Sequence, residues 1–120
     1  MSFEKLVFEP LPSTNNEHLF RLLGPVTLNN IFVLQEVVGQ PSLTTILDLT
    51  GVPYMDSAGL GILVKSHVSH QQNGQRLVLV GANQRVLELF KITKVDTVLE
   101  LAPDMEAAHR ALGRPERDIA

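Results

Sequence analysis

The 120-residue sequence predicts an α/β domain built on a mixed β-sheet of about five strands, flanked by about four helices. Short apolar runs typical of strands alternate with longer runs whose apolar residues recur at helical spacing. A turn-rich segment, residues 10–16, separates the first two strand-like runs and favours an antiparallel hairpin. The later strands are joined by connections long enough for right-handed helical crossovers, which pair strands in parallel.

The N-terminal half is expected to hold two paired strands, a helix and a central strand. The paired strands cover residues 3–8 and 18–23. Thr27 or Asn29 can cap the helix that follows. Its apolar face consists of Ile31, Leu34, Val37 and Val38. Residues 45–50 are apolar and β-branched, which predicts a central strand.

The C-terminal half continues the alternation. A long helix is expected to begin at Ser57 and to stop at Asn73-Gly74. Its apolar stripe consists of Leu60, Leu63, Val64 and Val68, with His67 and His70 placed on the polar face or at its boundary. The remaining elements are a strand at 76–80, a helix at 83–91, a strand at 98–101 and a closing helix from 104 through 112. We assign residues 1–112 to the domain and 113–120 to a flexible tail.

Composition and charge narrow the class of protein. The formal net charge of −3 includes no basic excess of the kind that a phosphate backbone requires, so no nucleic-acid partner is expected. The chain has no cysteine, which excludes disulfides and thiolate metal sites. No apolar run approaches the roughly 20 residues of a membrane span, and no signal-like segment opens the sequence. We therefore expect a cytoplasmic protein without direct membrane insertion.

The stretch VPYMDSAGLGIL, residues 52–63, places Asp56 and Ser57 just past the central strand, at the start of a helix. This edge of an α/β sheet is where ligands and partners usually meet the protein. A structural interpretation takes Ser57 as the helix cap and Asp56 as a carboxylate favoured by the helix dipole. It accounts less well for Gly59 and Gly61, because each helical glycine costs about 1 kcal/mol relative to alanine. Either another element of this chain or a partner must approach the helix start closely.

Three stretches follow the pattern of one known family: ILDLTGVPYMDSAGLGIL (46–63), NGQRLVLVG (73–81) and VLELFKITKVDTVLEL (86–101). They closely resemble the STAS domain of anti-sigma factor antagonists, and the resemblance extends in order over about residues 3–112. The positions that occupy the family pattern are Asp48, Asp56-Ser57, Gly59-Leu60-Gly61 and Asn73-Gly74.

The resemblance implies a phosphorylation-controlled protein switch. Ser57 is similar to the serine that is phosphorylated by an anti-sigma factor of the serine kinase type. In that scheme the unphosphorylated domain binds the anti-sigma factor and frees a sigma factor, phosphorylation breaks the complex, and a phosphatase resets it. The expected partner surface around the phosphorylation site comprises Asp56, Ala58, Gly59, Leu60, Gly61, Ile62 and Thr27. Of these, Leu60 or Ile62 is expected to be exposed and to supply apolar contact.

One departure from the family pattern leaves an alternative open. Many members carry G-E-L-D after the second strand, whereas this chain has Gly24-Pro25-Val26-Thr27, so Thr27 replaces an aspartate. Some STAS domains serve instead as scaffolds in stress-signalling assemblies or as regulatory subunits of membrane transport complexes. In that interpretation Ser57 is only a structural helix cap.

Enzyme, metal and nucleotide sites are not expected. The G-x-S-x-G elbow of hydrolases needs glycine where this chain has Met55, and Asp56 is poorly placed to orient a histidine base for Ser57. His67 and His70 are spaced for a shared metal but lack a third ligand. The G-x-x-x-x-G-K-[ST] phosphate loop is absent from the sequence, so no nucleotide cofactor is expected either.

Overall fold

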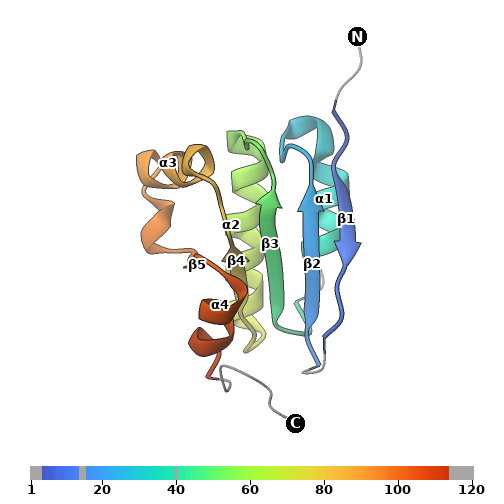
Figure 1. Cartoon of the computed structure of the whole chain (residues 1–120), viewed down its shortest axis with the longest axis vertical. Helices are drawn as coiled ribbons and strands as arrows, with labels where there is room; N and C mark the ends of the chain where they lie inside the picture. The colour runs from blue at the N-terminus through green and yellow to red at the C-terminus, as the bar shows by residue number, and fades with distance from the viewer. Residues whose placement is uncertain (1–3, 14–15, 40, 114–120) are drawn as a thin grey trace.

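A computed structural model describes residues 4–13, 16–39 and 41–113 of the chain (Figure 1). Within these residues the strands are β1 (Val7–Pro10), β2 (His18–Leu23), β3 (Thr45–Gly51), β4 (Leu77–Val80) and β5 (Glu100–Ala102). The helices are α1 (Ile31–Val38), α2 (Ser57–Gln72), α3 (Gln84–Ile92) and α4 (Met105–Ala111). Two short 3-10 helices, η1 (Leu28–Asn30) and η2 (Val95–Thr97), precede α1 and β5.

The strands form one mixed sheet in the order β1-β2-β3-β4-β5. β1 is antiparallel to β2, and every other neighbouring pair is parallel. The predicted fold class, a hairpin followed by parallel strands with helical crossovers, is therefore confirmed. The predicted tail lies outside the described residues except for Gly113.

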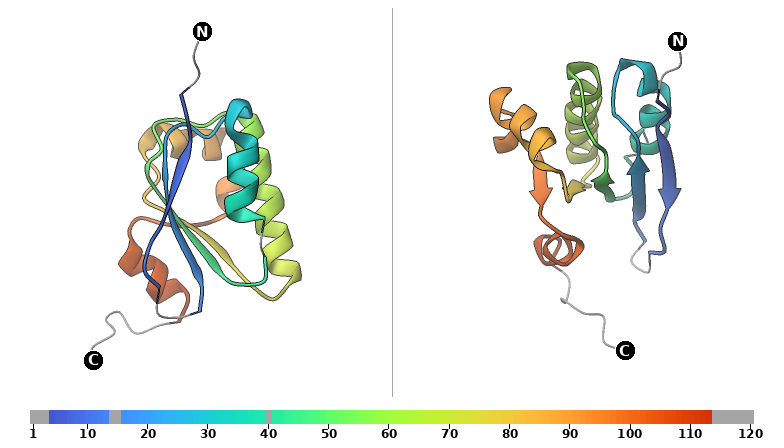
Figure 2. Two further views of the ribbon diagram at one scale, coloured as in Figure 1. Left: turned by 90° about the vertical axis from the view of Figure 1, so that its right-hand side faces the viewer. Right: turned by 45° about the horizontal axis from the view of Figure 1, so that its top comes forward.

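The helices cover the two faces of the sheet unequally. Figure 2 shows α1 and α2 on one face and α4 on the other. Successive side chains of a strand point to opposite faces, so β3 sends Leu47 and Leu49 into the larger core and Ile46 toward α4. The larger core also includes Leu34 of α1 and Phe90 of α3, both fully buried. This layering leaves the amino ends of α1, α2 and α3 near the carboxyl edge of the parallel strands.

β1 lies later in the chain than predicted. The expected strand covered residues 3–8, of which residue 3 lies outside the described part, whereas β1 starts at Val7. The cause is the partner strand: Val7 pairs with Leu23, and Gly24 then turns the chain away with a φ of 117°. The residues before Val7 therefore have no strand to pair with. Pro10 is tolerated because β1 is an edge strand.

β5 also starts two residues later than predicted. Lys94 adopts a left-handed conformation with a φ of 62°, and η2 follows it directly. The amides of Val98 and Leu99 both donate to the Val95 carbonyl, which holds this segment in a turn rather than a strand. Val98, predicted to lie in the strand, is 49% exposed as a result.

The histidines of α2 are buried, so their predicted placement on the polar face or at its boundary is wrong. His70 is fully buried, and its two ring nitrogens lie 2.8 Å from the Ser66 carbonyl and 2.9 Å from the Thr45 hydroxyl. His67 is 6% exposed, whereas Val68, predicted on the apolar stripe, is 43% exposed. The hydrogen bonds explain the burial of His70, because a polar ring can be buried when both of its nitrogens have partners. They do not account for His67, whose Nδ1 is buried without a hydrogen-bond partner in the described part of the chain.

We expect the fold to lose stability in mild acid because of His70. Burial disfavours the charged imidazole and lowers its pKa from the ordinary value of 6.5. The Ser66 carbonyl opposes this shift, and the nearby His18 and His67 rings add to it. Below pH 6.5 the unfolded chain therefore gains a proton that the folded chain resists. The contribution of neutral His70 to the free energy of unfolding is fully present above pH 6.5. It is lost as the pH falls toward the pKa of His70 in the folded protein, by at most about 1.4 kcal/mol per pH unit for one group.

The measurement is urea unfolding between pH 7.5 and 5.5 for wild type and His70→Gln. The variant should start less stable and lose less of its unfolding free energy on acidification. In the wild type, NMR signals of the His70 ring should keep their neutral-form shifts below pH 6.5. An ordinary titration of that ring in the folded protein would contradict the prediction.

Candidate functional site

The loops that follow β2 and β3 run side by side at the carboxyl edge of the sheet. The Val26 amide donates to the Tyr54 carbonyl at 3.1 Å, and the Asp56 amide donates to the Val26 carbonyl at 3.0 Å. Val26 and Met55 thereby form an isolated parallel bridge beyond the ends of the two strands. This bridge brings the segment that holds Thr27 next to the start of α2.

Asp56, not Ser57, caps α2. One carboxylate oxygen of Asp56 accepts a hydrogen bond from the Gly59 amide and the other from the Leu28 amide, both at 3.0 Å. A carboxylate can accept from two amides at once, so this single side chain fixes the starts of both α2 and η1. The interpretation of Ser57 as the cap is therefore wrong. Thr27 precedes η1 and makes no side-chain capping bond, whereas the first amide of η1, that of Leu28, donates to Asp56.

Ser57 is the first residue of α2, and its side chain is exposed. Its hydroxyl has no hydrogen-bond partner among the described residues. The amides of Ser57 and Ala58 lie in the first turn, where no helical carbonyl is available to accept from them. Together with the helix dipole, such amides favour an anionic group at this position. The hydroxyl is thus reachable, and a phosphate on it would be tolerated by the helix.

The two glycines of α2 have different structural reasons. A Cβ atom on buried Gly59 would lie 2.4 Å from the Val26 carbonyl oxygen, so this glycine is required by packing within the chain. Gly61 is exposed, and a Cβ atom there would meet nothing within 4 Å. Gly61 lies one turn after Ser57 on the same side of the helix, and helical side chains lean toward the N-terminus. A larger side chain at 61 would therefore cover the Ser57 hydroxyl.

The two residues predicted to supply apolar contact beside Ser57 differ in their exposure. Leu60 is 5% exposed and belongs to the core, so its expected role in an exposed contact is wrong, and Ile62 is half-buried. Leu28 and Phe32 are instead 63% and 78% exposed. Phe32 is displaced by about 100° around the helix from its neighbour Ile31, which begins the predicted apolar face. That displacement was the available signal that Phe32 faces solvent.

The loop between β3 and α2 is held on its other side by α3. The Asn83 side chain, which caps α3, donates to the carbonyls of Val52 and Pro53. The Arg85 guanidinium lies 5.0 Å from the centre of the Tyr54 ring. The Tyr54 hydroxyl donates to Glu4 at 2.9 Å, and this bond raises the pKa of Tyr54. These contacts position the loop that presents Ser57.

Asp48, the other acidic residue of the family pattern, has a structural role on β3. Burial alone would raise the pKa of Asp48, but hydrogen bonds from Thr50 and Arg21 outweigh burial and lower it. Arg21 also pairs with Glu9, so the three side chains link β1, β2 and β3 across one face of the sheet. In the described part of the chain, no three metal-ligating side chains gather in one place. Nor does any helix there have the length and apolarity to cross a membrane.

Comparison with known proteins identifies the family. The sequence model of the STAS domain matches residues 10–108. The chain belongs to the STAS domain family. The anti-sigma-B factor antagonist of Listeria monocytogenes is 44% identical over 55 residues, which are 46% of this chain and 48% of that protein. The STAS chain therefore matches about half the length of this curated relative.

Solved structures agree with this STAS fold. The anti-sigma factor antagonist SpoIIAA in its unphosphorylated form gives a TM-score of 0.71 at 17% identity, covering 91% of this chain and 99% of SpoIIAA. SpoIIAA from Bacillus in its phosphorylated form gives a TM-score of 0.64 at 16% identity, covering 88% of this chain and 99% of SpoIIAA. The murine anion transporter Slc26a9 gives 0.72 at 19% identity, covering 86% of this chain but 19% of the transporter. At these identities the likeness establishes the fold.

Proposed function

We propose that this STAS domain is an anti-sigma factor antagonist that binds a serine kinase-type anti-sigma factor while Ser57 is unphosphorylated. The observation that carries the proposal is the exposed Ser57 hydroxyl, without a partner in the described part of the chain, on the first turn of α2. The names of the curated relatives support the partner class. The two solved forms of SpoIIAA support a phosphorylation switch in a domain of this fold.

Phosphorylation at this position acts on the docking surface rather than on the fold. The kinase transfers the terminal phosphoryl group of ATP to the Ser57 oxygen, and ADP and the hydroxyl proton leave. The new group adds about −1.5 to −2 charges beside the Asp56 carboxylate. The first-turn amides of α2 accommodate it, so α2 stays folded. A partner surface shaped for a neutral hydroxyl must instead bury the charge, which costs several kcal/mol, and each 1.4 kcal/mol weakens binding about tenfold.

Asp56 and Thr27 have supporting parts in this mechanism. Both oxygens of Asp56 are engaged by backbone amides, so Asp56 positions the start of α2 and does not activate the hydroxyl. Thr27, on the adjacent loop, is neutral where many family members carry an aspartate. The phosphorylated state of this chain consequently has one negative charge fewer around Ser57. A phosphatase that hydrolyses the phosphoserine returns the domain to its binding state.

The direct test uses the serine kinase-type anti-sigma factors encoded by the genome that encodes this chain. The purified domain is incubated with each of them and ATP, and its mass and phosphopeptides are measured. We expect one phosphate per chain, located at Ser57, and no phosphate on Ser57→Ala. Without ATP hydrolysis, the wild type and Ser57→Ala should both form a stable complex. Absence of both a complex and a phosphoserine with every such kinase would contradict the proposal.

A second candidate function is a regulatory subunit or scaffold, in which Ser57 is never modified. The likeness to a fifth of the anion transporter Slc26a9 favours it, because a STAS fold also occurs within a membrane transport protein. In that case the domain should co-purify with a membrane complex, and mass spectrometry should find Ser57 unmodified in cells. Neighbouring genes for a kinase and a sigma factor, rather than for a transporter, would favour the first candidate.

A further inference from the structure

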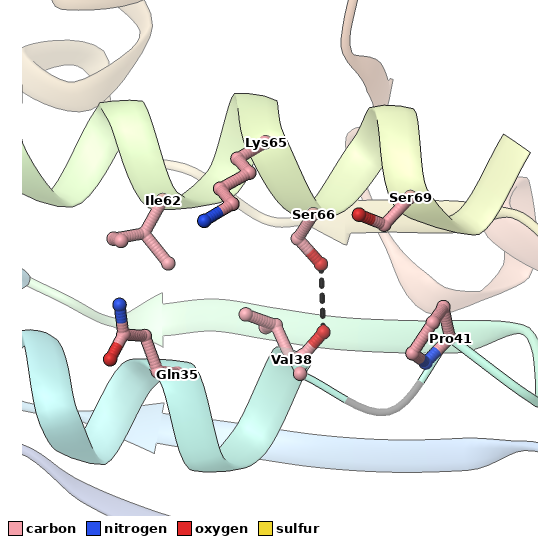
Figure 3. A pocket seen from close by; sticks show the side chains of 8 residues that line it. Gln35, Val38, Pro41, Ile62, Lys65, Ser66 and Ser69 are labelled. Atoms are coloured by element: carbon pink, nitrogen blue, oxygen red, sulfur yellow. Dashed lines mark hydrogen bonds between the residues drawn. The ribbon is translucent and has the colours of Figure 1, made fainter. Parts of the chain in front are cut away.

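A groove of about 270 Å³ opens between α1 and α2 (Figure 3). Gln35 and Val38 line it from α1, and Ile62, Lys65 and Ser69 line it from α2. Figure 3 shows Lys65 and Gln35 extending toward each other across the groove, with Ile62 beside them. The Ser66 hydroxyl in its wall already donates to the Val38 carbonyl at 2.8 Å. The polar groups that remain for an occupant are therefore those of Gln35, Lys65 and Ser69.

Two exposed apolar side chains precede the groove residues of α1 in the chain. Phe32 lies three residues before Gln35 in α1, one turn nearer the start of the helix and on the same side, and Leu28 lies in η1 just before α1. Their exposures of 78% and 63% are among the highest of the large apolar residues in the described chain. The Leu28 amide is hydrogen-bonded to Asp56, which directly precedes Ser57. This hydrogen bond places Leu28 next to the start of α2, which holds both Ser57 and the groove residue Ile62.

The charge of the groove indicates what can occupy it. Lys65 is the one charged residue among the described residues that line it. A second copy of this chain docked by two-fold symmetry would set the same patch against itself, and none of the lining residues carries a carboxylate to pair with Lys65. An occupant with a carboxylate is favoured instead. The groove is open at its sides, and none of its described lining residues has a buried polar side-chain atom without a hydrogen-bond partner. Both features fit a segment of a protein better than a small molecule.

We propose that this groove receives an amphipathic helix of the anti-sigma factor, which places apolar side chains on Leu28, Phe32 and Ile62 and an acidic side chain at Lys65. A helix suits the space because the valley between two packed helices accepts the side-chain ridge of a third. The proposal rests on the proposed function, since it names a second contact of the partner that docks over Ser57. The contact with Phe32 and Lys65 gives this chain a means of choosing its partner, independent of phosphorylation.

The test measures the affinity of the anti-sigma factor that phosphorylates Ser57, by calorimetry, for single variants of the full chain. Phe32→Ala should weaken binding at least about tenfold, since a central aromatic anchor carries a large share of interface energy. Lys65→Glu should weaken it several-fold and reduce its dependence on salt. Ile92→Ala is the matched control, because Ile92 is 79% exposed at the end of α3, away from the groove, and its affinity should equal wild type. Equal thermal midpoints establish that the variants are folded.

The outcomes separate the two proposals. If Ser57→Asp weakens binding while Phe32→Ala and Lys65→Glu bind as wild type does, the groove proposal is overturned and the proposed function stands. If wild type binds no serine kinase-type anti-sigma factor, the proposed function fails, and the groove proposal fails with it. Self-association of this chain that is abolished by Phe32→Ala would assign the groove to a second copy and overturn the helix proposal.

Discussion

Ser57→Asp is expected to weaken the complex with the anti-sigma factor by at least about a hundredfold, whereas Ser57→Asn should stay within a few-fold of wild type. The two replacements have the same size and shape and differ in charge. Burying an uncompensated carboxylate against a surface shaped for a hydroxyl costs several kcal/mol, and a neutral amide costs much less. A hundredfold loss corresponds to about 2.7 kcal/mol. Calorimetry or surface plasmon resonance on the three proteins measures the difference.

The stability of the same variants provides the control. Ser57 is the first helical residue, so an aspartate there interacts favourably with the positive end of α2. Urea unfolding should therefore find Ser57→Asp at least as stable as wild type. A loss of binding without a loss of stability locates the effect in the interface. Equal affinities of Ser57→Asp and Ser57→Asn would show that charge at this position does not control docking.

The order and type of the elements could be predicted because local patterns and tertiary packing agree along this chain. Asn73-Gly74 ends α2 where predicted, and Asn83 and Asp104 cap α3 and α4 with their side chains. The strand boundaries were less predictable, since they depend on a partner. β1 begins only where β2 can pair with it at Val7.

The sequence allowed us to predict which segment holds the candidate site, but not the individual hydrogen bonds within it. A pattern of polar residues at a helix start indicates a cap, but Asp56 and Ser57 are both capping residues, and sequence does not set the helix start to within one residue. The decisive hydrogen bond, donated by the Leu28 amide to the Asp56 carboxylate, joins residues 28 apart in the chain. Such a contact depends on the bridge between Val26 and Met55, which no local pattern contains.

The burial of α2 was partly mispredicted for a related reason. Hydrophobicity assigned Val68 to the apolar stripe of α2 and His70 to the polar face or its boundary. The structure reverses them, because the Thr45 hydroxyl on β3 and the Ser66 carbonyl supply partners to the imidazole. Burial of a polar side chain is decided by groups distant in sequence, so it becomes visible only when the sheet and the helix are placed together.

Substitution of glycine by alanine is expected to have opposite effects on the free energy of unfolding at the two glycines of α2. Gly59→Ala places a methyl group 2.4 Å from the Val26 carbonyl oxygen, a backbone atom in the bridge that joins the two loops. Either α2 shifts or the bridge opens, and we expect a loss of about 2 kcal/mol of unfolding free energy or more. Gly61→Ala meets open space and should gain about 0.5–1 kcal/mol, since alanine is the better helix former. Urea unfolding with equal m-values compares the two variants directly.

The effect of Gly61→Ala on stability tests why an exposed position of α2 holds glycine. If Gly61→Ala stabilises the fold, then Gly61 weakens α2 without a compensating contact inside the chain, and close approach of a partner to Ser57 accounts for it. A longer side chain should then interfere with function while leaving the fold intact. Gly61→Leu is expected to slow phosphorylation of Ser57 at least about tenfold, because its side chain leans back over the hydroxyl. Destabilisation by Gly61→Ala, or phosphorylation of Gly61→Leu at the wild-type rate, would contradict this explanation.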